Sequence, residues 1–162
     1  MNLLVSDTGP LNYLIQIEAV DLLNDIASEI IIPASVLKEL RNDQAPRVVR
    51  LWAETPPEWL IVVEDPDVQS DPSSALSKTD LAVITLACQR KSILLMDDRN
   101  GREMARSMKV TVIGTVGILL VAAEWELVDF PAAMSRLQST SIFLSPKIIQ
   151  EAWTRYEAMK SH

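Results

Sequence analysis

Histidine and cysteine are almost absent from this chain, because His162 and Cys88 are its only representatives. A disulfide within the chain is therefore excluded, and so are zinc sites built from cysteine and histidine. Catalysis by a serine–histidine or cysteine–histidine pair would depend on a histidine at the last position, where chain ends commonly fray. Cys88 closes the apolar run LAVITLAC, so we expect it to be a small core residue and not a nucleophile.

The sequence also lacks a hydrophobic segment long enough to cross a bilayer. Its longest apolar run, residues 110–123, is interrupted by threonines and glycines and is shorter than the roughly 20 residues that a membrane span needs. No positive charge precedes the apolar residues at the N-terminus, so we expect neither a signal peptide nor a transit peptide. We therefore expect no membrane association and a cytoplasmic location.

Positive charge is in short supply as well, with 15 Lys and Arg against 22 Asp and Glu and a formal net charge of -7. This balance argues against a protein that binds nucleic acid through its overall electrostatic field. An acidic total is also what remains when carboxylates are gathered around a metal ion. Charge alone therefore does not separate a nuclease from a protein that binds no nucleic acid.

What the sequence does contain is an alternation of short apolar runs and helical patterns. The runs predict strands at 3–5, 29–32, 60–63, 92–96 and 110–113, and the patterns predict helices at 11–17, 20–26, 36–40, 45–53, 77–89, 102–108, 115–124, 131–137 and 145–159. We expect Thr115 to cap its helix and the polar segment 64–74 to be a mobile loop. Continuous apolar strands alternating with helices predict a three-layer α/β/α fold around a mostly parallel five-stranded sheet. The length predicts one domain, 1–162, with 131–162 as a C-terminal helical extension.

Acidic residues follow two of the predicted strands directly. Asp7 ends the first strand, and Asp97 and Asp98 end the fourth, which places them at the carboxyl edge of a parallel sheet, where ligands bind. Glu39 lies in the helix after the second strand, and Asp80 lies in the first turn of the helix before the fourth. Carboxylates that converge without histidine or thiolate suit Mg²⁺ or Mn²⁺, and without a cation they would repel one another.

Each of these acids also has a purely structural alternative. Asp7 could cap the helix at Pro10, and Asp80 could form a capping box with Ser77. Glu39 could be a solvated helix residue, and the two adjacent aspartates could be turn and cap residues. The joint placement of the acids at one edge, and not any single acid, favours a metal site.

Four segments together resemble the PIN-domain family, in particular small prokaryotic PIN-like proteins and VapC-type toxin ribonucleases. They are, in order, VSDTGPLNYL, IIPASVLKEL, TDLAVITLA and LLMDDRNGREMA, and the resemblance extends over about 3–123. It implies that the acids bind Mg²⁺ or Mn²⁺ and that a metal-activated water cleaves RNA, with Thr8 supporting the first acid. The implied catalytic and metal-binding acids are Asp7, Glu39, Asp80 and Asp98. It also implies an antitoxin partner, and we expect a homodimer.

The fourth motif departs from the family pattern, since Met96 stands where a threonine is usual. The division of roles between Asp97 and Asp98 is therefore open, and we favour Asp98 as the inner ligand because adjacent residues leaving a strand point apart. Substrate phosphates need positive partners, for which Arg99, Arg102 and Arg106 are the nearest candidates. Salt bridges with neighbouring acids are an equally good interpretation of these three arginines.

Two other functions remain open from the sequence. One is a PIN-like interaction module with little catalytic turnover. The other is a phosphoryl-transfer domain of the receiver or haloacid-dehalogenase kind, for which Asp7-Thr8-Gly9 lacks the second acid that dehalogenases need. The last predicted helix carries Trp153 and Tyr156, which we expect to pack on the core, with a dimer face or an antitoxin surface as alternatives.

Overall fold

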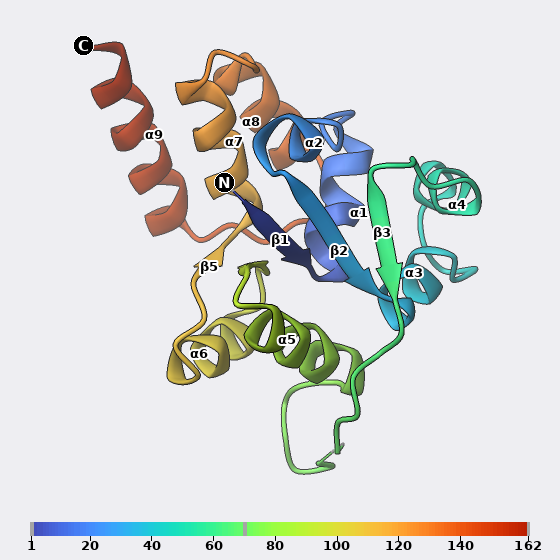
Figure 1. Ribbon diagram of the computed structural model, residues 1–162. Coiled ribbons are helices and arrows are strands. Elements are labelled where there is room, and N and C mark those ends of the chain that lie inside the picture. The colour runs from blue at the N-terminus through green and yellow to red at the C-terminus, as the bar shows by residue number, and fades with distance from the viewer. Residues whose placement is uncertain (1, 70, 162) are drawn as a thin grey trace.

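A five-stranded, entirely parallel sheet forms the centre of the protein (Figure 1). The computed structural model describes residues 2–69 and 71–161. The strand order is β3-β2-β1-β4-β5, with β1 at Leu3–Ser6, β2 at Glu29–Pro33, β3 at Leu60–Val63, β4 at Ile93–Leu95 and β5 at Val112–Ile113. The first strand is thus central, and the order reverses beside it. The prediction of a parallel sheet from continuous apolar runs is confirmed, although β4 and β5 are shorter than predicted.

Helices cover both faces of this sheet. In Figure 1, α5 and α6 lie on one side, whereas α1, α7 and α8 lie on the other. The helices are α1 (Thr8–Gln16), α2 (Leu22–Ile26), α3 (Ala34–Leu40), α4 (Arg47–Glu54), α5 (Lys78–Arg90), α6 (Arg99–Ser107), α7 (Thr115–Glu124), α8 (Phe130–Gln138) and α9 (Pro146–Lys160). The predicted three-layer α/β/α architecture is confirmed. Among the described residues, no helix combines the length and the apolar character that crossing a bilayer requires.

The middle of each strand is apolar, as expected for a sheet with helices on both faces. Leu4, Val5, Ile32, Leu94 and Leu95 are inaccessible to solvent. Polar atoms can enter such a layer only where a strand ends and the following loop supplies partners. Within the described residues, Asp7 at the end of β1 is the only acidic or basic side chain that is buried. The fold therefore singles out this carboxylate.

The C-terminal helices join the same core through an aromatic cluster. The buried ring of Phe130 packs edge-on against Trp153, with 5.4 Å between centroids, and is stacked on Tyr156 at 4.8 Å. Trp153 and Tyr156 are partly buried against the core, so the expectation that these two side chains of α9 pack on the core is confirmed.

Two local expectations from the sequence are wrong. Cys88 is exposed, because the buried side of α5 consists of neighbours such as Ile84 and Ala87 and the last turn leaves the thiol facing outward. The N-cap of α7 is Gly114 and not Thr115, because the helix begins one residue earlier than the hydroxyl would require. The Thr115 side chain is thus available for another contact.

Candidate metal centre

Asp7 lies at the junction of β1 and α1 with a carboxylate that its own helix does not use. It occupies the N-cap position of α1, yet its side chain accepts no capping hydrogen bond, and only 8% of the residue is exposed. Burial, together with the negative charges of Asp80, Glu39 and Asp97, raises the pKa of Asp7 from 3.8 to about 7, and burial is the largest cause. The backbone of Thr8 acts in the opposite direction. Asp7 is thus a buried carboxylate surrounded by other carboxylates.

Glu39 reaches this edge from α3. The Thr8 hydroxyl donates a hydrogen bond of 2.6 Å to Oε1 of Glu39, which joins the first turn of α1 to the last turn of α3. Thr8 therefore supports the second acid through its side chain and the first through its backbone. The resemblance implied that the Thr8 side chain supports the first acid, Asp7, whereas the hydroxyl in the structure contacts Glu39.

Asp80 takes part in the capping box that the sequence suggested as its structural alternative. Oδ2 of Asp80 accepts from the Ser77 backbone at 2.9 Å, and the Ser77 hydroxyl accepts from the Asp80 backbone at 3.0 Å. Among the described residues, the other oxygen, Oδ1, has no hydrogen-bond partner. Since the charge of Asp80 also raises the pKa of Asp7, its capping role and its proximity to the candidate centre coexist.

The adjacent aspartates after β4 separate in space. Both oxygens of Asp97 accept hydrogen bonds from Thr115, Oδ1 from the backbone N–H at 2.8 Å and Oδ2 from the hydroxyl at 2.6 Å. Asp98 is exposed and caps α6, accepting from the Gly101 N–H at 2.8 Å. Of these two aspartates, only Asp97 is among the charges that raise the pKa of Asp7. This placement favours Asp97 near the centre, whereas the sequence favoured Asp98.

The carboxylates form a loose group around Asp7 and not a closed cage. In the part of the chain that the structure describes, no three Asp, Glu, His or Cys side chains lie close enough to hold one ion together. The donor set nevertheless fits a hard divalent cation, since it consists of carboxylate oxygens alone. A cation beside Asp7 would also offset the repulsion and the burial that raise the pKa of this acid.

The three arginines proposed to contact substrate phosphates differ in the contacts that they already make. Arg99 forms an exposed salt bridge of 3.3 Å with Glu103 within α6, which is the alternative to phosphate binding that the sequence left open. Arg102 is half-buried and donates from Nη1 to the Met96 carbonyl at 3.0 Å, and burial together with the charge of Arg106 lowers its pKa. The exposed Arg106 has no hydrogen bond or ion pair within residues 2–69 and 71–161, which leaves it the most available of the three.

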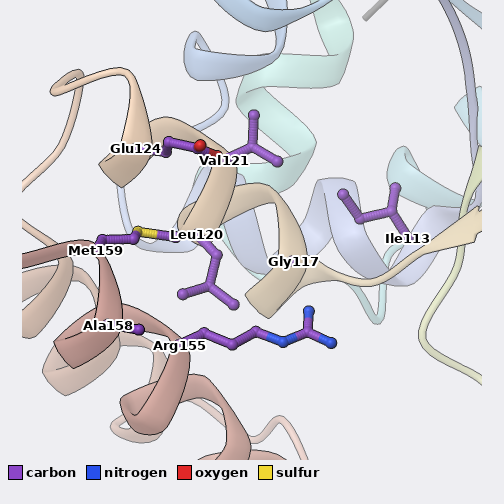
Figure 2. Close-up of a pocket in the computed structure, with 8 residues that line it drawn as sticks. All are labelled: Ile113, Gly117, Leu120, Val121, Glu124, Arg155, Ala158 and Met159. Carbon is purple, nitrogen blue, oxygen red and sulfur yellow. The ribbon is translucent and has the colours of Figure 1, made fainter. Parts of the chain in front are cut away.

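A cavity of about 450 Å³ lies elsewhere, between α7 and α9. Figure 2 shows Leu120, Met159 and the Arg155 side chain along its wall, beside Gly117. None of the acids described above lines this cavity. The candidate centre is therefore at the edge of the sheet and not in this cavity.

The residues that hold Asp97 were not predicted from the sequence. Thr115 was expected to cap a helix, and Gly114 carried no expectation at all. A Cβ atom at position 114 would lie 2.8 Å from Oδ1 of Asp97 and 2.9 Å from Nη1 of Arg102, so a larger residue would require these two side chains to move. The one available signal was the Gly-Thr pair directly after the last predicted strand.

Comparison with known proteins gives one match to a family. A family model described as PIN domain matches residues 3–158. A solved structure, a PilT N-terminus domain protein from the hyperthermophilic archaeon Sulfolobus solfataricus, is similar at 11% sequence identity over 90% of this chain and 100% of that chain. The TM-score of this match is 0.48. The comparison with curated proteins found no match.

Proposed function

Since this chain belongs to the PIN-domain family, whose members are generally nucleases that use divalent metal ions, we propose that it is a Mg²⁺- or Mn²⁺-dependent endoribonuclease. The single observation that carries the proposal is the environment of Asp7. A buried carboxylate whose pKa is raised to about 7, with three further acids acting on it, is an arrangement that a bound cation would stabilise.

Asp7, Glu39, Asp80 and Asp97 would hold the ion. A divalent cation supplies a water of lowered pKa and offsets negative charge on the phosphodiester transition state. Asp7 would hold the ion as the carboxylate, so ion binding would release the proton that Asp7, with a pKa of about 7, partly holds near pH 7. Arg106 is the residue that can contact a substrate phosphate without first breaking a contact.

RNA as the substrate, a cytoplasmic location and a role as the toxin of a toxin–antitoxin pair belong to the same proposal. The substrate, the toxin role and an antitoxin partner rest on the four sequence motifs. The location rests on the N-terminal sequence and the apolar runs, and a homodimer is a further expectation. Because the net charge is -7, we expect binding of RNA to depend on the metal ion and on a few arginines and not on a broad basic surface.

The direct test is cleavage of a structured RNA by the purified full chain in Mn²⁺, with a chelator and with Asp7→Asn. We expect both to abolish cleavage, because Asn removes the charge that binds the ion. Asp129→Asn is a matched control, since Asp129 is also an N-cap aspartate, bonded to the Ala132 N–H at 3.0 Å at the start of α8. Cleavage that survives Asp7→Asn would come from a contaminant and would refute the assignment.

A second candidate is an interaction module with the PIN fold and little turnover. The observation that favours it is the absence, among the described residues, of a closed group of three metal-ligating side chains. Calorimetry with Mn²⁺ separates the two functions, because a nuclease of this kind must bind the ion. A full chain that binds no Mn²⁺ would favour the interaction module.

A further inference from the structure

We propose that Thr115 is the positioning residue of the metal centre, holding Asp97 through both of its carboxylate oxygens. This inference rests on the proposed metal-dependent function and extends it to a residue outside the four acidic motifs. Asp97 and Thr115 are 18 positions apart and meet because β4 and β5 are parallel neighbours in the sheet.

Thr115 is built for a fixed contact. It is completely buried, and it donates to Asp97 twice, from the backbone at 2.8 Å and from the hydroxyl at 2.6 Å. Hydrogen bonds to a carboxylate are stronger than those between neutral groups. Since α7 is capped by Gly114, the hydroxyl is not needed by its own helix.

The surroundings of this pair restrict Asp97 further. Gly114 leaves room on the side where a Cβ atom would press on Oδ1 of Asp97 and on Nη1 of Arg102. Arg102 is itself fixed by its bond to the Met96 carbonyl, and its charge lies close enough to Asp97 for the two to attract. Arg102 thus belongs to the same support, which explains why it is less available to substrate than Arg106.

A carboxylate held in this way can still bind a cation. Each of its oxygens accepts one hydrogen bond in the structure and has capacity for a second interaction. Because the side chain is already ordered before the ion binds, ion binding does not have to include the entropic cost of ordering it. Residues that orient metal ligands in this manner typically change metal affinity by about 10- to 100-fold when they are replaced.

The test is Mn²⁺ calorimetry on the full-length chain with Thr115→Val and Thr115→Ser. We expect Thr115→Val to weaken Mn²⁺ binding by about tenfold or more, and Thr115→Ser to restore affinity because it retains the hydroxyl. Thr154→Val is the matched control, since this exposed threonine bonds only the Gln150 carbonyl within α9. Thermal melting without metal, run on each variant, separates loss of fold from loss of ligand positioning.

The possible results are distinguishable. Wild-type affinity in a folded Thr115→Val protein would overturn the positioning role. If Thr115→Val does not fold, Gly114→Ala, which presses on Asp97 while retaining both donors, must lower Mn²⁺ affinity, and unchanged affinity would again overturn the role. Absence of Mn²⁺ binding by the wild-type chain would instead refute the proposed function itself.

Discussion

Asp7 and Asp98 stand in the same local context and end up in opposite states. Each is the N-cap residue of a helix that follows a strand of the central sheet. Asp98 accepts a hydrogen bond from the N–H of Gly101 and is exposed, whereas Asp7 makes no capping bond and is buried among other acids. The charge of Asp98 is stabilised by its capping hydrogen bond and by water. The charge of Asp7 is buried without a capping bond, so a bound cation would stabilise it.

The largest effect that tests this contrast is the pH dependence of stability. Between pH 3.8 and about 7 the folded metal-free protein holds a proton on Asp7 that the unfolded chain has lost. The free energy of unfolding should therefore fall as pH rises through this window, by on the order of 4 kcal/mol in total. Urea denaturation at several pH values, with a chelator present, measures this slope.

Asp7→Asn is the variant that isolates this term. Because Asn does not ionise, the decline attributable to position 7 should vanish, leaving the variant more stable than the wild-type chain at pH 8 without metal. Asp129→Asn should retain the wild-type decline. An unchanged slope in Asp7→Asn would mean that Asp7 is not the buried charge that the structure indicates.

A smaller effect is expected at Asp98, where the comparison predicts a cap and no metal ligand. Asp98→Ala should destabilise the protein by about 1 kcal/mol, and Asp98→Asn by less, because Asn also accepts at an N-cap. Mn²⁺ affinity should be unchanged in both Asp98 variants, whereas replacing a metal ligand or a residue that orients one should lower it by about tenfold. Urea denaturation and calorimetry measure the two quantities. Loss of Mn²⁺ binding in Asp98→Asn would make Asp98 the ligand and reverse the assignment.

The smallest effect is expected for Thr8→Val, which breaks the 2.6 Å bond to Glu39. The contact is exposed, so its loss should cost about 1 kcal/mol or less. Mn²⁺ affinity should fall less than in Thr115→Val, because the lost contact is exposed to water, whereas the Thr115 hydroxyl that bonds Asp97 is buried. A drop in Mn²⁺ affinity larger than that of Thr115→Val would show that Glu39, and not Asp97, is the acid whose position matters most.

Features that depend on residues close together in the sequence were predicted, whereas features that depend on residues far apart in the sequence were not. The buried strand β1 and the acid that ends it were predicted, because an apolar run followed by Asp-Thr-Gly-Pro is a local signal. The choice between Asp97 and Asp98 was not predicted, because it depends on which side chain reaches Thr115 at the start of α7, after the neighbouring strand β5. The prediction that Cys88 is a core residue was wrong for a related reason. Helical spacing alone does not tell where the last turn of α5 stops being covered by the rest of the protein.

The sequence by itself determined the alternation of strands and helices, the parallel sheet and the presence of several acids at its carboxyl edge, because apolar periodicity and turn residues act over a few positions. Only the tertiary structure decided which carboxylates cap a helix or bond another side chain and which one is buried without a capping bond. That distinction depends on side chains brought together from β1, α3, α5, β4 and α7, and no single segment contains it.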